Sequence, residues 1–247
     1  AAVHPLFTHL IEYAHTQSIE RYEMRKNFVA LTAVIGAIAF APSALAAQVP
    51  QYVLSTNDAA TISVLASSGD IISGKILPGV PDGMGVLKNA DGTLSLLSNH
   101  ELSISDKTVQ LGKKDTGTWG SSISKLTYDP ATGSIKAVSS FINSVQYYDY
   151  NNKAYTADYT KSIPTGYPAL DSFGSENFSN GLNRFCSANL VQAGGLLHKE
   201  GKKTFGYNGA LYFTSEEGSD YSRTFAFDTK GNGFQLPKMG LGGYENA

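Results

Sequence analysis

The sequence predicts an all-β fold, and two observations lead to this class. Beyond residue 47, glycine, serine, threonine, asparagine and tyrosine interrupt every apolar run within a few residues, so long helices are not expected. Short apolar strands separated by turn signals recur instead. Repeated antiparallel units of this kind are typical of a β-propeller or a β-sandwich, and no strict repeat motif decides between them. We expect a β-propeller that is incomplete in this chain, with the β-sandwich as the alternative.

The N-terminal residues have the pattern of an export leader. Met24 is followed by a short basic head, the thirteen-residue apolar run 28–40 and the small residues 43–47, the layout of a secretory signal peptide. A transmembrane anchor is the alternative, but such a run rises only about 20 Å as a helix, short of the roughly 30 Å hydrocarbon core. We expect a signal peptide at 24–47, upstream translated sequence at 1–23, and a periplasmic or secreted protein without a membrane span after cleavage.

The charge of the chain argues against partners that carry many negative charges. It contains 19 basic and 21 acidic residues, a formal net charge of −2, and residues 1–47 hold three of each sign. The mature protein is therefore not expected to bind nucleic acid or an anionic membrane through a basic surface. Outside residues 1–47 the histidines are His100 and His198, so a histidine-rich zinc site is not expected either.

The strand predictions follow the turn signals along the chain. Residues 84–97 are expected to form a hairpin, because Gly92 supplies the positive φ that a tight reversal needs. Residues 123–139 are expected to form a second hairpin around a turn at 129–133, with alternate apolar residues on its first arm.

The second half of the chain is expected to contain one more strand pair and a long loop region. Residues 210–214 and 224–227 are predicted as paired strands. Residues 143–183 are rich in Tyr, Asn, Ser and Gly, and we expect long surface loops there. The chain stops at 242–247 without an obvious closing strand, so we expect 48–247 to be the N-terminal part of a larger propeller domain.

Several side chains beside turns are candidates for metal chemistry. Glu101 directly follows a predicted strand; the alternative is a solvated carboxylate at a hairpin edge. Glu216 and Glu217 repel one another unless a cation lies nearby, and in a strand they point to opposite faces; the alternative is a charged surface step. Gly83 and Gly85, near Asp82, either form a turn, which needs no ligand, or leave room for the backbone to approach an ion.

Cys186 is the single cysteine of the chain, so no internal disulfide is possible and burial must hold the fold together. Exported proteins normally avoid unpaired thiols, which raises the question of what this one does. A thiol beside a turn can serve as a metal ligand, and a coordinated thiol loses its proton. The alternative is a buried thiol that acts as a small hydrophobic side chain.

In combination, six short segments give the chain a resemblance to the PhoX-type alkaline phosphatases. The resemblance covers most of residues 78–247 and depends on the order of the segments and their strand–turn context. The segments are LPGVPDGMGV at 77–86, LLSNHEL at 96–102, RFCSANL at 184–190, LYFTSEEG at 211–218, RTFAFD at 223–228 and the terminal GGYENA.

The resemblance implies a β-propeller with Fe³⁺ and Ca²⁺ clustered at its axial site, and a small phosphomonoester as substrate. The positions that match the metal-binding segments of the family are Glu101, Cys186, Glu216 or Glu217, and Glu245. On this basis we expect a secreted metal-dependent phosphomonoesterase in which Cys186 is an iron ligand.

One departure from the family favours a second function. Family members have a Trp-containing stretch and a Cys-Glu-Glu close after the ligand cysteine, whereas about thirty residues separate Cys186 from Glu216 here, and residue 215 is a serine. The alternative function is a non-catalytic exported propeller, stabilised by calcium, whose Tyr-rich and Asn-rich loops bind a glycan or a protein.

Overall fold

The structure is a computed structural model that describes residues 55–56, 59–103, 107–109, 117–166, 181–218 and 220–245. The chain divides into two compact units, Ala1–Ser67 and Ser68–Ala247. The predicted upstream segment and signal peptide lie outside the described residues, as does residue 247. Among the residues that are described, no helix has the length and apolar character needed to cross a membrane.

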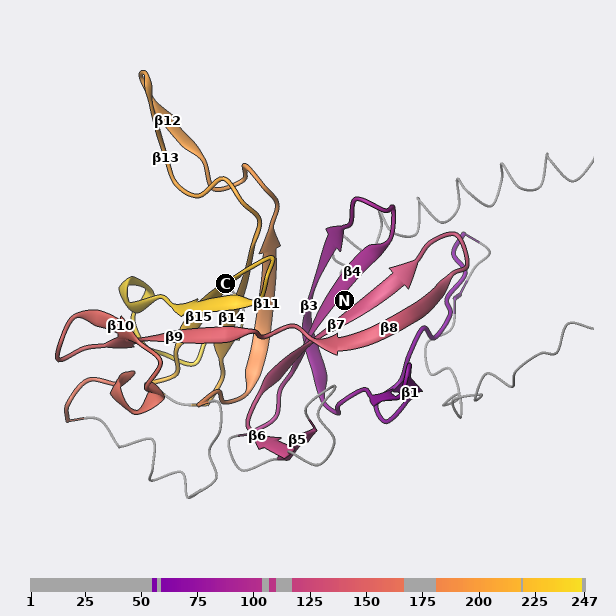
Figure 1. Cartoon of the computed structure of the whole chain (residues 1–247), viewed down its shortest axis with the longest axis horizontal. Helices are drawn as coiled ribbons and strands as arrows, with labels where there is room; N and C mark the ends of the chain where they lie inside the picture. Colours follow the sequence, from indigo (N-terminus) through magenta and orange to yellow (C-terminus); the bar gives the residue numbers. More distant parts are fainter. Residues whose placement is uncertain are drawn as a thin grey trace, which may run out of the picture. The chain divides into compact units, whose positions relative to one another are not determined.

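The second unit is built from strands, which confirms the all-β class. One sheet has four strands in the order β3-β4-β7-β8, all antiparallel. The other has six strands in the order β10-β9-β16-β15-β14-β11, antiparallel except for the β16–β9 pair. Figure 1 shows the two sheets, and neither closes on itself.

The bounds of the strands in the two large sheets are as follows: β3 Pro81–Lys88, β4 Leu94–His100, β7 Ser122–Asp129, β8 Ser134–Ser140, β9 Ser144–Asp149, β10 Ala154–Thr156, β11 Phe185–Val191, β14 Leu211–Glu216, β15 Thr224–Asp228 and β16 Asn232–Gln235. Three small two-stranded sheets pair β1 Ile71–Ile72 with β2 Lys75–Ile76, β5 Lys107–Val109 with β6 Gly117–Trp119, and β12 His198–Glu200 with β13 Lys203–Phe205. Two 3₁₀ turns, η2 Tyr159–Lys161 and η4 Pro237–Met239, complete the described elements.

The predicted hairpins are present because their turns have the expected chemistry. The β3–β4 turn places Gly92 at φ 86°, and Asp91 accepts a hydrogen bond from the Thr93 amide at 3.0 Å. The β7–β8 turn places Gly133 at φ 65°, with Asp129 accepting from the Ala131 amide at 2.9 Å. These are aspartate-capped reversals with glycine at the left-handed position.

The prediction of long loops over 143–183 was wrong for its first part. Residues 143–166 contain β9, β10 and η2, while 167–180 lie outside the described residues. Tyr147 on β9 is buried, 3% exposed, and packs edge-on against Phe225 with ring centroids 6.0 Å apart. The tyrosines that suggested loops are strand formers when one face of the strand is covered.

Within the described residues, a hydrophobic core cluster joins the two large sheets. Both sheets contribute side chains, and the aromatic rings meet edge-on, for example Phe185 and Phe225 with centroids 5.7 Å apart. The buried members of this core are Leu97, Ile123, Phe141, Tyr147, Leu182, Phe185, Tyr212, Phe225 and Phe227. The core therefore fixes the two sheets against one another and not only the strands within each.

Polar contacts between the sheets are buried and specific. Asn99 at the end of β4 is fully buried and donates to the Ser187 carbonyl and to the Thr214 hydroxyl, both at 2.9 Å. The Tyr212 hydroxyl donates to the Asn99 side-chain oxygen at 2.8 Å. Because buried amides need partners, this network fixes the end of β4 to β11 and β14.

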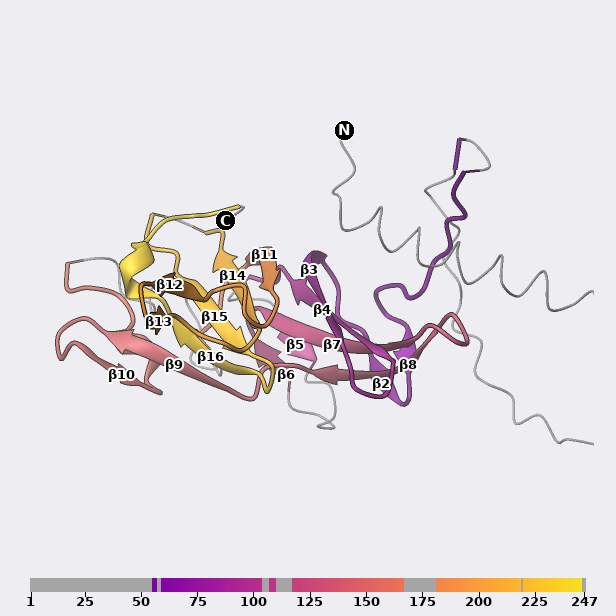
Figure 2. The same ribbon diagram turned by 90° about the horizontal axis from the view of Figure 1, so that it is seen from above.

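Strands β3 and β11 lie side by side where the two sheets meet (Figures 1 and 2). A Cβ at Gly83 would come within 2.5 Å of the Ala188 amide nitrogen and 2.6 Å of the Cys186 carbonyl oxygen. A Cβ at Gly85 would come within 2.9 Å of the Leu190 Cβ. Both glycines are strand residues that permit this close approach, and neither belongs to a turn.

Candidate metal centre

Three potential metal ligands from three separate segments converge beside the contact between β3 and β11, which we call the crossing. One ligand atom each of Asp82, Glu101 and Cys186 lies within 4.8 Å of the other two. Asp82 is exposed, Glu101 is half-buried and Cys186 is buried. In the ranges that the structure describes, this is the single group of three or more His, Cys, Asp or Glu side chains arranged in this way.

The backbone explains why these residues meet. Asp82 lies near the start of β3, at an irregularity in its pairing with β4 between Pro81 and Met84. Glu101 follows β4, and its amide donates to the Val80 carbonyl at 2.9 Å, which holds the two carboxylate-bearing segments together. Gly83 then allows the same segment to reach the Cys186 carbonyl on β11.

Two residues next to the cluster have unfavourable backbone conformations. Val80 has φ 49° and Arg184 has φ 46°. For a β-branched residue such as valine, the left-handed region is a genuine outlier, and strain of this kind persists where the surroundings enforce it, frequently at functional sites. Arg184 is held on both sides, since its amide donates to the Leu102 carbonyl and its carbonyl accepts from the Glu217 amide, each at 2.9 Å.

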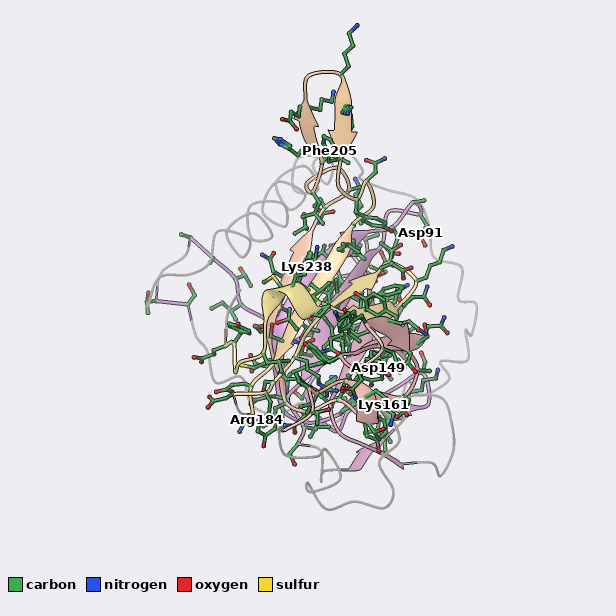
Figure 3. The ribbon with its side chains drawn as sticks, turned by 90° about the vertical axis from the view of Figure 1, so that its left-hand side faces the viewer. Asp91, Asp149, Lys161, Arg184, Phe205 and Lys238 are labelled. Atoms are coloured by element: carbon green, nitrogen blue, oxygen red, sulfur yellow. The ribbon has the colours of Figure 1, made fainter. Side chains whose placement is uncertain are left out.

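Arg184 connects the cluster to a further carboxylate. Its Nε and Nη2 both donate to Glu101 Oε1, at 2.9 and 2.5 Å, and Nη2 also donates to Glu217 Oε2 at 3.1 Å. These carboxylates raise the pKa of the Arg184 guanidinium, the hydrogen bond to Glu101 being the largest cause. The side chain is 44% exposed, and Figure 3 shows it among the side chains at one end of the sheets.

The Cys186 thiol is held in its neutral form. Burial is the largest cause that raises its pKa to about 12, followed by the hydrogen bond to Asp82 and the charges of Asp82, Glu101 and Glu217. A thiol in this state is a poor nucleophile at neutral pH. A cation among the same carboxylates would reverse the effect, because a coordinated thiol is deprotonated outright.

Glu216 lies apart from the cluster, in a buried ion pair. Arg223 Nε donates to Glu216 Oε2 at 2.8 Å and Nη2 donates to Oε1 at 2.5 Å. The amides of Asn183 and Arg223 also donate to this carboxylate, each at 2.9 Å. The neighbouring Glu217 follows β14, which ends at Glu216, and accepts a hydrogen bond from Arg184, so the two glutamates pair with different arginines.

Glu245 is the remaining ligand predicted from the sequence, and Asp82 is a ligand candidate that the sequence prediction missed. Glu245 is exposed and follows η4; it is not part of the Asp82–Glu101–Cys186 cluster. Asp82 lies in the segment 77–86 but was not among the predicted ligands, because the glycines after it favoured a turn. The signal for Asp82 was the Gly83–Gly85 pair beside it, which marks a close backbone approach.

The donor set can hold a cation that accepts both sulfur and oxygen. Carboxylates suit many metal ions, whereas a thiolate suits iron or zinc and not calcium, which prefers oxygen ligands.

No protein-family model, curated protein or solved structure matches this chain.

Proposed function

We propose that the chain is part of a periplasmic or secreted, metal-dependent phosphomonoesterase whose metal centre includes Asp82, Glu101 and Cys186. The observation that carries this proposal is the convergence of a thiol and two carboxylates within 4.8 Å from three separate segments. The strained Val80 and Arg184 beside them support a functional rather than a packing role.

The strand order supports a propeller as the architecture of this enzyme. β3, β4, β7 and β8 form one four-stranded meander, and β11, β14, β15 and β16 form a second within the six-stranded sheet. Each propeller blade is a meander of this kind, arranged around a central channel. We infer that the two meanders are neighbouring blades and that β3 and β11, which lie alongside one another, are their inner strands.

In this proposal the ligands divide by chemistry. Iron takes Cys186 with Asp82 and Glu101, because a thiolate suits iron. Calcium takes carboxylates that carry no thiol beside them, for which Glu217 and the exposed Glu245 are the candidates. Glu216 contributes to the fold instead, since Arg223 and two backbone amides already occupy its carboxylate.

The residues of the chain would each have a defined task. A bound metal ion supplies a Lewis acid that polarises phosphoryl oxygens and neutralises developing negative charge. Cys186 and the two carboxylates hold this ion at the crossing of β3 and β11. Arg184 carries a planar guanidinium fork next to it, and this geometry matches two phosphoryl oxygens at once. The substrate class that fits is a small phosphomonoester.

A second candidate function is supported by a partly exposed cluster of three aromatic side chains. Tyr148, Tyr155 and Phe234 form successive edge-on contacts, with centroids 5.6 and 5.8 Å apart, and Tyr155 and Phe234 remain 47% and 43% exposed. Exposed aromatic side chains of this kind are typical of binding surfaces. A non-catalytic propeller would bind a glycan or a protein there. If the protein is such a binding module, Tyr155→Ala should abolish binding. If it is a phosphatase, the Tyr155→Ala variant should keep its phosphatase activity.

The proposed activity is tested with the full-length protein and p-nitrophenyl phosphate in the presence of ferric iron and calcium. We expect hydrolysis by the wild type and a loss of ~100-fold or more in Cys186→Ser and Asp82→Asn, because loss of a ligand removes the metal. Asp91→Asn, in the β3–β4 turn, is the matched control and should keep full activity. Undiminished hydrolysis in both ligand variants contradicts the proposal.

A further inference from the structure

Arg184 lies between the carboxylates of Glu101, which belongs to the cluster, and Glu217, which does not. Its Nη2 lies 2.5 Å from Glu101 Oε1 and 3.1 Å from Glu217 Oε2, and the two carboxylates are brought together by this one guanidinium. The Arg184 side chain is 44% exposed, whereas Glu101 is 17% exposed. The arginine therefore contributes charge to the cluster more than it fills space in the fold.

Backbone contacts fix the Cα of Arg184 but do not fix the position of its guanidinium. Arg184 has φ 46° and precedes the point, between Phe185 and Ser187, where the pairing of β11 with β14 shifts. Its amide and carbonyl are both hydrogen-bonded, to Leu102 and Glu217. The Cα is held on both sides while the half-exposed guanidinium can reach solvent, so it can leave the carboxylates without disturbing the strand.

We propose that Arg184 is the internal counter-ion of the cluster: it pairs with Glu101 and Glu217 until a metal cation binds, and the cation displaces it. This inference rests on the proposed function, because it takes Glu101 as a metal ligand. A guanidinium keeps its positive charge at any accessible pH. A cation must therefore compete with it for the same carboxylate oxygens and against its repulsion.

Displacement has a consequence for the anion that binds next. Once the cation holds Glu101, the guanidinium fork is free to donate to two phosphoryl oxygens. Cation and phosphate then bind cooperatively, and linkage requires that each strengthens the other by the same factor. Arg184 would thus make phosphate recognition conditional on the presence of the metal.

Titration of the metal-free, full-length protein with Co²⁺ tests the competition, followed by the absorption of the cobalt–thiolate bond. Arg184→Gln should bind Co²⁺ on the order of tenfold more tightly than the wild type, because it removes the competing charge. Arg184→Lys should bind about threefold more tightly, since it keeps a point charge without the fork. Lys136→Gln on β8 removes the same charge from a surface pair with Asp129 of β7 and should leave Co²⁺ affinity unchanged.

Binding of inorganic phosphate, measured by calorimetry with and without Co²⁺, gives the second readout. We expect Co²⁺ to strengthen phosphate binding to the wild type on the order of tenfold and by a clearly smaller factor in Arg184→Gln, where the cation attracts the phosphoryl oxygens without the guanidinium. A purely structural role for Arg184 would neither raise cation affinity on its removal nor link the two ligands.

The outcomes separate this inference from the proposed function. If the wild type binds Co²⁺ and folded Arg184→Gln binds it equally or more weakly, the counter-ion role is wrong and the metal centre stands. If neither protein binds Co²⁺, both the counter-ion role and the metal centre are wrong. If Arg184→Gln does not fold, Arg184→Lys decides, and affinity equal to or below that of the wild type overturns the inference.

Discussion

Arg184 and Arg223 each pair with a glutamate, but burial gives the two pairs different consequences. Arg223 is 1% exposed, lies over the rings of Tyr147 and Phe225, and donates to Ser162 at 2.6 Å. Arg184 is half-exposed and forms its contacts at the surface. The first pair holds strand ends and loops together in the core, whereas the second is the pair that we propose a metal cation displaces.

The buried pair should dominate stability when its cation is removed. Arg223→Met leaves Glu216 as a buried charge without its partner, and we expect a loss of about 3–5 kcal/mol in the free energy of unfolding. Arg184→Met breaks an exposed pair and should cost less than about 1 kcal/mol. Urea unfolding of both variants measures the difference, and equal costs would show that the core pair is not structural.

His100 should make stability depend on pH in a window set by its burial. The imidazole lies 2.8 Å from the Gly79 carbonyl and 2.7 Å from the Ser124 hydroxyl, and burial lowers its pKa below 6.5. Because the folded state favours the neutral ring, the stabilisation is present above the unfolded pKa and is lost as pH falls through the folded pKa. The slope should approach about 1.4 kcal/mol per pH unit between the two values.

Unfolding midpoints measured from about pH 7.5 to about pH 5 check this dependence. His100→Gln should lack the decline, because an amide does not titrate, while His198→Gln on the exposed β12–β13 hairpin should retain it. The assignment to His100 fails if the decline persists unchanged in His100→Gln.

At the scale of elements, local signals predicted hairpins well and long-range pairing poorly. The β3–β4 and β7–β8 hairpins could be predicted because Gly92 and Gly133 lie within a few residues of the strands they connect. β9 was missed although it forms a hairpin with the nearby β10, and its second partner β16 follows 88 residues later, with Ser144 opposite Asn232. A sequence pattern within a few residues of β9 cannot indicate its pairing with a strand as distant in the chain as β16.

The residues of the candidate site also divide into those that local sequence could predict and those that depend on long-range contacts. Glu101 and Cys186 could be named from the sequence, because a carboxylate after a strand and a lone thiol are visible in any linear reading. The roles of Asp82 and Arg184 could not, because they depend on β3 lying against β11, a contact between segments about one hundred residues apart. The glycines of β3 permit that contact, but from the sequence a turn was the preferred explanation of them, and the alternative was an approach to an ion.

The crossing of β3 and β11 should fail if Gly83 acquires a side chain. In Gly83→Ala the new Cβ would lie 2.5 Å from the Ala188 amide nitrogen, and backbone cannot move aside cheaply. We expect a loss of about 1–3 kcal/mol in the free energy of unfolding together with weaker metal binding, because Asp82 moves away from Cys186. Gly79→Ala is the matched control, since nothing lies within 4 Å of a Cβ there.

Chemical denaturation and cobalt titration of the two alanine variants measure both effects. Equal stability of Gly83→Ala and Gly79→Ala would contradict the close approach of the two strands. Lower stability with unchanged metal affinity would separate the crossing from the site.

At the scale of the whole molecule, one core and one buried polar network join the two meanders, so the site lies between parts that cannot move independently within the second unit. The propeller, the export signal at 24–47 and the metal ions remain predictions. The export signal comes from a sequence pattern and the metal ions from the family resemblance, and the contact between β3 and β11 supports the propeller.

Metal removal should destabilise the full-length protein as a whole. A ligand that binds only the native state stabilises it by about 2.7 kcal/mol at a free concentration ~100 times its dissociation constant. For a domain of this size we expect chelation to lower Tm by roughly 5–10 °C. Differential scanning calorimetry with and without excess chelator measures the change, and an unchanged Tm counts against structural metal.

The central claim is that Cys186 is a metal ligand, and ferric titration of the metal-free protein tests it most directly. We expect a thiolate-to-iron absorption band that saturates with bound iron in the wild type, because iron removes the proton that burial and the carboxylates otherwise keep on the thiol. The band should be absent in Cys186→Ser, which should also retain less iron. Full iron binding without such a band in the wild type, or equal iron occupancy in Cys186→Ser, would contradict the account and leave Cys186 as a buried thiol.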